Sequence, residues 1–238
     1  FRKLLFVGPP GTGKSTLCVA LSKIALEQHG VVVYVSSSQK ENNESNFTQV
    51  HRALRISDSA HYPVLLVIED LDAYLLEKDE KSQILNVLDG VEAPNNPHGV
   101  LLVATTNYPE IIDERISKRP GRIDRIFYIP PIEDADQALR MLKRYLGEQW
   151  ASEHETIARD LIGQTGVFVR EIALYARILA ANAKQSSVSL HLLKQSVKRL
   201  KAQLATGYNL QPHRAIGFGT LAPQTEREAE KTEIAARG

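Results

Sequence analysis

The stretch Gly8-Pro9-Pro10-Gly11-Thr12-Gly13-Lys14-Ser15 decides the fold of this chain. It follows the apolar residues 4–7, which predict a buried strand, and it precedes residues 16–26, whose apolar positions recur at helical spacing. A strand, a glycine-rich loop, Lys-Ser and a helix in this order are typical of a phosphate-binding loop, or P-loop. Glycines let backbone N–H groups curl around phosphate oxygens, and the helix opening at Gly13 adds free N–H groups. The sequence therefore predicts binding of a nucleoside triphosphate.

Two side chains of this loop have expected roles. Lys14, which we expect to be an exposed loop charge, should reach the β- and γ-phosphates, and the Ser15 hydroxyl should ligate Mg²⁺. The predicted nucleotide-binding residues of the loop are Gly8, Pro9, Pro10, Gly11, Thr12, Gly13, Lys14, Ser15 and Thr16. A glycine-rich turn that binds nothing is the alternative. It is disfavoured because all eight motif positions are filled and both flanks match.

The bulk composition shows no strong electrostatic bias. The 238 residues are 43% hydrophobic and 24% charged, and 29 basic against 28 acidic residues leave a net charge of +1. This balance gives no global attraction to nucleic acid or membrane, and no apolar run approaches the ~18 residues of a membrane span. The single Cys18 rules out an internal disulfide and favours a reducing compartment, so we expect a cytoplasmic location. Because the chain opens at Phe1, directly on a strand, we interpret it as part of a longer protein.

Apolar runs alternate with helical patterns through the first half of the chain. Further strands are expected at residues 31–35, 64–68, 100–104 and 125–129, and helices at about 44–55 and 79–89. Strands that are apolar along their length and alternate with helices indicate a parallel sheet covered on both faces. The predicted fold class is α/β, a P-loop parallel sheet sandwiched by helices.

Strand patterns end at Pro130-Pro131. Four helical patterns follow, at about 133–149, 152–163, 167–184 and 188–205. The last residues mix glycine, proline and charge with few apolar side chains, which favours a loose tail. We therefore divide the chain into an α/β P-loop domain (residues 1–131), a small all-α lid domain (132–205) and a flexible tail (206–238).

A second, acidic site is expected beside the P-loop. The strand at 64–68 ends in Glu69 and Asp70, and Asp72 follows two residues later. In phosphoryl-transfer proteins one such acid serves the metal and another the attacking water. Solvated acids at a strand exit are the alternative, but adjacent carboxylates repel without a cation. The sequence therefore predicts that one of these acids faces the metal together with Ser15 and that another polarises the water.

These motifs together resemble the AAA ATPases, over residues 4 to about 205. The P-loop matches the family's form, including the two prolines, and Glu69-Asp70-Leu71-Asp72 is similar to its Asp-Glu-x-Asp segment with the acids exchanged. Three further segments are similar to the family's inter-subunit signalling turn, sensor-1 strand end and Gly-Ala turn: Leu88-Asp89-Gly90-Val91, Ala104-Thr105-Thr106-Asn107 and Thr165-Gly166-Val167. The stretch Arg119-Pro120-Gly121-Arg122-Ile123-Asp124 is similar to its second region of homology.

The resemblance implies roles for these residues. Asn107 would hold the water and the γ-phosphate, and Gly166-Val167 would lie beside the ribose and adenine. Arg119 and Arg122 would project into a neighbouring subunit as catalytic arginine fingers; a structural pair such as Arg122 with Asp124 is the alternative. The resemblance also implies a hexameric ring that uses ATP and Mg²⁺ to remodel a macromolecular client.

The sequence departs from the family pattern in three places. The acids are exchanged, so the resemblance implies that Glu69 would face the metal and Asp70 would polarise the water. Aspartate is one methylene shorter than glutamate, so the base would act from a longer distance. Residues 39–44 contain no aromatic where threading members carry a pore loop, so aromatic-paddle translocation is not predicted. Ser117-Lys118 adds one residue before Arg119, which could rotate the arginine pair. Arg170, in the helical part, is interpreted as a surface salt bridge rather than a γ-phosphate contact.

Three functions remain open at this point. Our interpretation is an ATPase that hydrolyses ATP with Mg²⁺ at the subunit interfaces of a ring and remodels an unidentified protein client. The exchanged acids and the polar pore loop somewhat favour a regulatory module that binds ATP and assembles but hydrolyses little. A clamp-loader-like, DNA-associated ATPase is disfavoured by the neutral charge, so neither a nucleic-acid partner nor a membrane partner is predicted for this chain.

Overall fold

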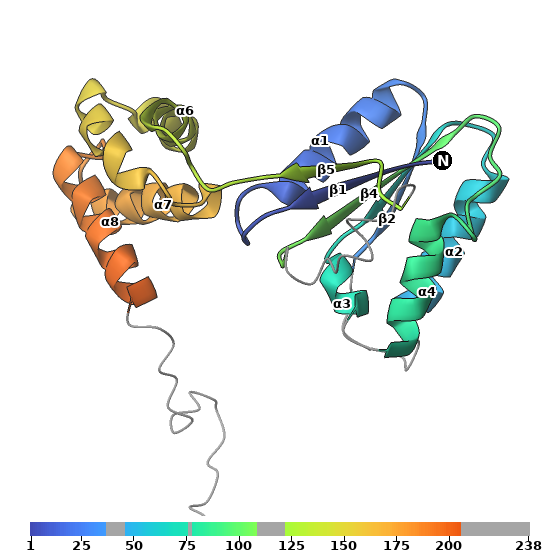
Figure 1. The fold of residues 1–238 in the computed structure, drawn as a ribbon. Coiled ribbons are helices and arrows are strands. Elements are labelled where there is room, and N and C mark those ends of the chain that lie inside the picture. The colour runs from blue at the N-terminus through green and yellow to red at the C-terminus, as the bar shows by residue number, and fades with distance from the viewer. Residues whose placement is uncertain (37–45, 76–77, 109–121, 206–238) are drawn as a thin grey trace, which may run out of the picture. The chain divides into compact units, whose positions relative to one another are not determined.

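A computed structural model describes residues 1–36, 46–75, 78–108 and 122–205 of the chain. Among them, the residues up to Tyr128 form one sheet flanked by helices, and the residues that follow are helical (Figure 1). The chain divides into a compact unit Phe1–Lys198 and a second unit Arg199–Gly238, of which residues 199–205 are described. Four subjects of prediction lie outside the described residues: the stretch 39–44, Ser117-Lys118, Arg119 and the tail 206–238.

Five parallel strands form the sheet, in the order β2-β3-β4-β1-β5. Their bounds are β1 Arg2–Val7, β2 Val31–Val35, β3 Val64–Ile68, β4 Val100–Thr106 and β5 Arg125–Tyr128. Parallel strands end at the same edge of a sheet. The P-loop follows β1, Glu69 follows β3 and Asn107 follows β4, so the predicted site residues meet at the carboxyl edge. The predicted α/β class with a parallel sheet is confirmed.

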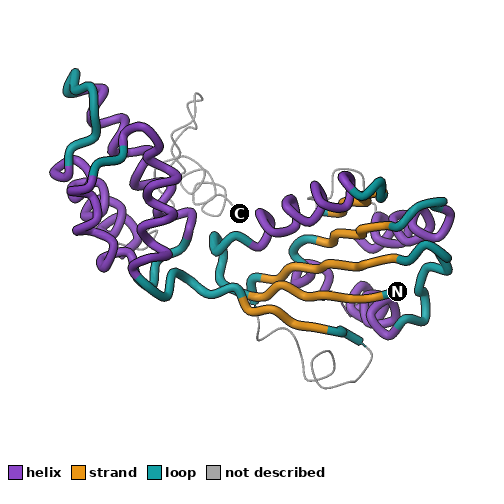
Figure 2. The backbone as a smooth tube through the Cα atoms, turned by 90° about the horizontal axis from the view of Figure 1, so that it is seen from above, coloured by secondary structure: helices purple, strands orange, loops and turns teal. Residues whose placement is uncertain are grey.

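Helices lie on both faces of this sheet (Figures 1 and 2). Their bounds are α1 Lys14–Glu27, α2 Asn46–Ser59, α3 Leu71–Leu75 and α4 Lys78–Asp89. The main core lies between the sheet and α2, α3 and α4, and includes the fully buried Leu66, Tyr74 and Leu102. A smaller core beneath α1 includes Cys18 and Val67. The sequence did not predict α3, because five residues are too short to show a helical period.

Burial differs between the centre and the edges of the sheet. Every residue of β3 is buried because the strand has neighbours on both sides and helices on both faces. Every residue of β5, the edge strand beside β1, is exposed, whereas β2, the other edge strand, is mostly partly buried because α1 and α2 pack against it. The expected covering of both faces therefore holds for the centre of the sheet but not for β5.

The second half of the chain contains the helices α6 Ala135–Leu146, η2 Gly147–Gln149, η3 Ser152–Leu161, α7 Gly166–Asn182 and α8 Leu190–Ala205. The Asp134 carboxylate caps α6 by accepting from the Gln137 N–H (2.6 Å), and the Thr165 hydroxyl caps α7. None of the described helices combines the length and the apolar character that a membrane crossing requires. The three-part division of the chain at residues 131 and 205 stays a prediction.

Candidate nucleotide-binding site

Two glycines shape the P-loop. Gly13 precedes α1 with φ 109°, in the left-handed region that other residues rarely adopt. Gly8 lies against the chain after β5, where an added Cβ would stand 2.2 Å from the carbonyl oxygen of Ile129. Gly13 is thus required by its backbone angle and Gly8 by the lack of space for a side chain. Because neither residue carries a side chain, the backbone of the loop stays accessible to a ligand.

Lys14 points into the loop. Its side chain is 6% exposed, and its Nζ donates to the carbonyl oxygens of Gly8 (2.7 Å) and Pro9 (2.9 Å). The expectation of an exposed loop charge is wrong, because the inward carbonyl groups give the amine acceptors within the fold. Burial lowers the pKa of Lys14, and the charges of Asp70 and Asp72 oppose that shift. A phosphate that enters the loop competes with two carbonyl groups for this amine.

Asp70 and Asn107 are brought together at the carboxyl edge. The Asn107 Nδ2 donates to the Asp70 Oδ1 (3.1 Å), and the Asp70 N–H donates to the Thr105 hydroxyl (3.1 Å). Burial raises the pKa of Asp70, and the charges of Asp72 and Glu69 raise it further. The backbone of Asp70 has φ 52°, in the left-handed region. This carboxylate is therefore held in an unfavourable environment and is a better proton acceptor than an ordinary aspartate.

Asp72 accepts hydrogen bonds that hold two elements of the fold together. Its Oδ1 accepts from the Thr106 hydroxyl (2.8 Å) and from the Asn107 N–H (3.3 Å). These bonds tie the first turn of α3 to the end of β4. Asp72 thereby fixes the backbone from which Asn107 projects.

Glu69 immediately precedes Asp70, at the end of β3. Its Oε1 is buried and has no hydrogen-bond partner among the described residues. Its charge also affects two residues besides Asp70 and Lys14: burial and Glu69 raise the pKa of Cys18 to about 12, and burial and a hydrogen bond to Glu69 raise the pKa of Tyr34. The Glu69 carboxylate therefore faces β2 and α1.

A cavity of about 600 Å³ lies at this edge. Its lining contains most of the predicted site residues: Pro10, Gly11, Thr12, Gly13, Lys14, Ser15, Thr16, Asp70, Asn107, Gly166 and Val167. Four predicted residues of the described chain are not part of the lining: Gly8, Pro9, Glu69 and Arg122. The first turn of α7 reaches the P-loop, where the Val167 N–H donates to the Gly11 carbonyl oxygen (3.2 Å).

Several lining residues were not predicted from the sequence: Leu17, Thr105, Ile129, Met141, Tyr145 and Arg170. Met141 and Tyr145 lie four residues apart on α6, so they share one helix face. Gly166 and Arg170 have the same spacing on α7. This spacing was visible in the sequence, but nothing in it distinguished a cavity wall from an ordinary helix contact.

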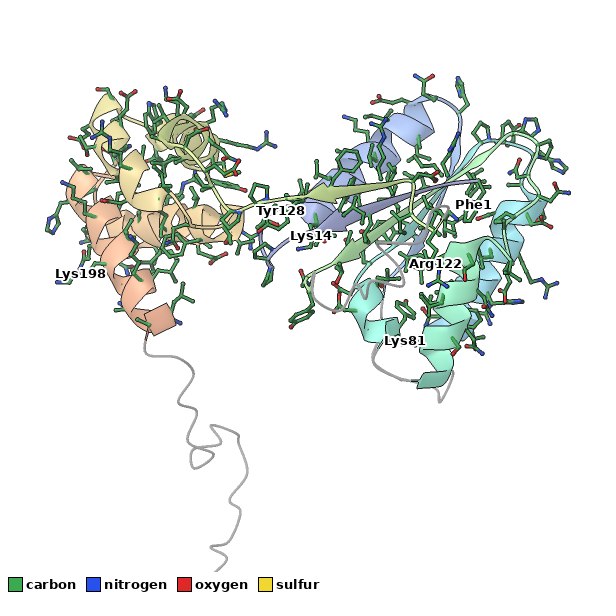
Figure 3. The ribbon with its side chains drawn as sticks, viewed as in Figure 1. Phe1, Lys14, Lys81, Arg122, Tyr128 and Lys198 are labelled. Atoms are coloured by element: carbon green, nitrogen blue, oxygen red, sulfur yellow. The ribbon has the colours of Figure 1, made fainter. Side chains whose placement is uncertain are left out.

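Arg122 lies elsewhere. It is 5% exposed and forms a bidentate ion pair with Asp89, the last residue of α4, through its Nε to Oδ1 and its Nη2 to Oδ2 (2.6 Å). Figure 3 shows it beside α4, whereas Lys14 lies at the other end of the sheet. At about 3.3 Å per strand residue, the two are separated by roughly 20 Å. Asp124, the partner considered from the sequence, instead pairs with Arg2 (3.0 Å). Arg122 therefore does not belong to the cavity of its own chain.

The first part of the chain matches a known protein family. Residues 4–131 match the family described as "ATPase family associated with various cellular activities (AAA)". The chain belongs to the AAA family. Membership of this family indicates ATP hydrolysis, in agreement with the P-loop and the acidic strand end.

Curated relatives of the AAA chain include proteins named "ATP-dependent zinc metalloprotease FtsH". The protein from Haemophilus influenzae is 26% identical over 266 residues, which cover 100% of this chain and 40% of the relative. The protein from Endomicrobium trichonymphae is 30% identical over 217 residues, covering 84% and 33%. FtsH 2 of a Thermoanaerobacter species is 28% identical over 212 residues, covering 85% and 41%. The chain thus spans 33–41% of the length of these relatives.

Proposed function

We propose that this AAA chain hydrolyses ATP with Mg²⁺ at the subunit interfaces of a ring-shaped, hexameric oligomer and uses the energy to remodel a protein client. One observation carries the proposal: the P-loop, Asp70 and Asn107 line a single cavity of about 600 Å³. That volume is within the range of small-molecule sites. The zinc metalloprotease activity in the relatives' name is theirs, and the proposal does not depend on it.

The P-loop would bind the phosphates. The N-terminus of α1 and the turns at its glycines present backbone N–H groups, which favour negative charge. Lys14 would exchange its bonds to the carbonyl groups of Gly8 and Pro9 for bonds to phosphate oxygens. The exchange is favourable because the ammonium group would then face a full negative charge in place of the dipoles of two neutral carbonyl groups. Gly166 and Val167 would lie beside the sugar and base, in keeping with the contact between Val167 and Gly11.

Ser15 and Glu69 would hold the magnesium ion. The proposal for Glu69 rests on its place directly after β3 and on its Oε1, which is buried without a hydrogen-bond partner among the described residues and is therefore costly for a carboxylate without a cation. Because Glu69 does not line the cavity, its side chain would have to turn toward Ser15. Ser15 lines the cavity at the first turn of α1. When bound, Mg²⁺ neutralises charge that develops on the β- and γ-phosphate oxygens.

Asp70 would polarise the attacking water. Its raised pKa makes it a better base than an ordinary aspartate, and the Asn107 amide holds its Oδ1 in place. As water attacks the γ-phosphorus, its proton passes to Asp70 and the bond to the β-phosphate oxygen breaks. Asn107 would also contact the γ-phosphate.

A cation from a neighbouring subunit would complete the site. Within the described residues, Lys14 and Arg170 are the cationic side chains that line the cavity, and Arg122 lies roughly 20 Å from the P-loop of its own chain. Arg122 would release Asp89 and contact the γ-phosphate of the next subunit, together with Arg119. Such arginine fingers contribute roughly 10³–10⁵ in rate.

A second candidate function is supported by the position of Glu69. Because Glu69 does not line the cavity, the chain could bind ATP and assemble with little hydrolysis. Rapid-mixing measurement of phosphate release separates the two functions. A burst or steady release that depends on Asp70 supports the ATPase, and bound ATP without release supports the regulatory module.

Mixing two inactive variants tests the site between subunits. An Arg122→Ala chain keeps its P-loop, and a Lys14→Ala chain keeps its arginines. Each should be inactive alone, and a mixture should regain activity at hybrid interfaces. Arg125→Ala, on the exposed strand β5, is a matched control that should remain active. No recovery in mixtures that light scattering shows to be assembled would exclude the contribution in trans.

A further inference from the structure

We propose that Arg170 contacts the base of the bound nucleotide by stacking its guanidinium on the ring, and that this contact, with Tyr145, favours purines over pyrimidines. The inference rests on the proposed nucleotide-binding function and extends it to the end of the cavity away from the phosphates. No predicted role in the P-loop, the acidic pair or the sensor strand includes either residue.

The two ends of the cavity differ in chemistry. The phosphate end is formed by Lys14, Ser15, Asp70 and Asn107, which are polar or charged. The other wall contains Ile129, Met141, Tyr145, Val167 and Arg170. Apolar side chains with one aromatic ring and one guanidinium suit a flat aromatic ligand, and they do not suit a phosphate.

Helix geometry places Arg170 on this wall. Val167 fixes the first turn of α7 to the P-loop through its bond to Gly11 (3.2 Å). Arg170 follows three residues later, so its Cα lies about 4.5 Å further along the helix axis, away from the P-loop contact. Met141 and Tyr145 of α6 line the same cavity. A base that extends from phosphates in the P-loop would therefore pass Val167 and meet Arg170.

The guanidinium of Arg170 can change partners at small cost. It donates from Nε (3.2 Å) and Nη2 (3.0 Å) to one oxygen of Glu171, and the two side chains are 58% and 42% exposed. Exposed ion pairs contribute little to stability. Arg177, further along the same helix, differs: its Nη2 donates to the carbonyl oxygens of Tyr145 and Leu146 (both 2.6 Å) and so caps the end of α6. Arg170 is thus the arginine of this helix that both lines the cavity and is weakly held.

A guanidinium that stacks on the base fits this position better than a cation that acts through its charge alone. Guanidinium is planar and weakly hydrated, so it stacks on aromatic faces, whereas a lysine ammonium does not. Stacking on a base by a protein side chain is sensitive to the size of the ring and tolerant of its edge groups. A purine, with its two fused rings, gains more from this contact than a pyrimidine.

The test compares nucleotide with phosphate alone. Dissociation constants would be measured by calorimetry for Mg-ADP, Mg-CDP and magnesium tripolyphosphate. The chains would be the parent, Arg170→Ala, Arg170→Lys and two controls, Glu171→Gln and Arg144→Ala; Arg144 is exposed on α6 and does not line the cavity. We expect Arg170→Ala to weaken ADP binding about 5- to 10-fold, at the low end of measured base stacking. Binding of tripolyphosphate should stay unchanged, and the ratio of the CDP to the ADP dissociation constant should fall.

The variants separate the possible roles of the charge. Arg170→Lys should resemble Arg170→Ala, because it keeps the charge and loses the plane, and both controls should bind ADP as the parent does. Full recovery by Arg170→Lys, or equal losses of ADP and tripolyphosphate, would show a phosphate contact and overturn the inference. Unchanged ADP binding by Arg170→Ala would overturn it as well, without touching the proposed function. A parent chain that binds neither ADP nor tripolyphosphate would overturn both.

Discussion

Replacing Asp70 with asparagine should stabilise the nucleotide-free chain while removing hydrolysis. Burial raises the pKa of Asp70, and Asp72 and Glu69 raise it further, so at neutral pH the ionised carboxylate opposes folding. The backbone at φ 52° is one that asparagine tolerates. Asparagine removes the charge and keeps an acceptor for the Asn107 amide. We expect a gain of about 1 kcal/mol, which corresponds to roughly 2–4 °C in Tm for a chain of this size.

The pH dependence follows from the direction of the shift. The folded chain holds the Asp70 proton more tightly than the unfolded chain, so the destabilisation is fully present above the raised pKa. It disappears as the pH falls through the ordinary aspartate value of 3.8. The advantage of Asp70→Asn should therefore be largest at neutral pH and should vanish toward acid.

Replacing Asp72 should have the opposite effect and lower the stability of the chain. Its carboxylate accepts bonds of 2.8 and 3.3 Å from Thr106 and Asn107, and the residue is 9% exposed. Hydrogen bonds to a charged group contribute about 1.5–3 kcal/mol each, and the second bond is long. Asp72→Ala should cost about 3 kcal/mol, or roughly 6–12 °C.

The assay is thermal unfolding followed by circular dichroism, in EDTA and without nucleotide, because bound ligand would add its own stabilisation. Urea titration of the same variants checks the free energies. A lower Tm for Asp70→Asn than for the parent at pH 7 would refute the inference that burial and neighbouring negative charges make the ionised Asp70 carboxylate destabilising. Equal effects at Asp70 and Asp72 would show that the two acids do not differ in environment as described.

Four further outcomes are expected. Lys14→Ala should abolish tight ATP binding measured by calorimetry with the fold retained by circular dichroism; tight binding by this variant would contradict the P-loop assignment. Glu69→Gln should mainly raise the Mg²⁺ concentration needed for ATP binding, whereas Asp70→Asn should trap unhydrolysed ATP, and the reverse pattern would show exchanged roles. Cys18, buried with its pKa raised to about 12, should react with a thiol reagent at pH 8 only after unfolding, and fast labelling of the native chain would disprove its packing. Asp89→Ala should cost about 3–5 kcal/mol in urea unfolding, because the Arg122 side chain is 6% exposed. Arg122→Ala should cost less, because the Asp89 side chain is 32% exposed and regains water; equal losses would rule out this asymmetry.

Local sequence determined the strands and the P-loop. The runs at 31–35 and 64–68 became β2 and β3 with the same bounds, because continuous apolar residues between breakers form strands of a parallel sheet. Of the described strands, only β3, in the interior of the sheet, is buried along its whole length. The P-loop is also local: its glycines, Lys14 and Ser15 are adjacent in the chain, and the helix that follows them begins at Lys14. The edge strand β5 was predicted as a strand, but whether an edge strand is fully exposed, as β5 is, or partly buried, as β2 is, depends on what packs against it.

Tertiary structure alone decided which distant side chains meet. The pairs Asp70 with Asn107 and Arg122 with Asp89 join residues 37 and 33 positions apart. The family pattern implied that Asp70 and Asn107 both act on the attacking water, but nothing in the sequence selected Asp89 over Asp124 for Arg122. The direction of the Lys14 side chain likewise depends on the positions of the Gly8 and Pro9 carbonyl groups to which its Nζ donates. Sequence periodicity fixes which face of an element is apolar, whereas ion pairs and cavity walls depend on how separate elements pack, and that information is distributed over the whole chain.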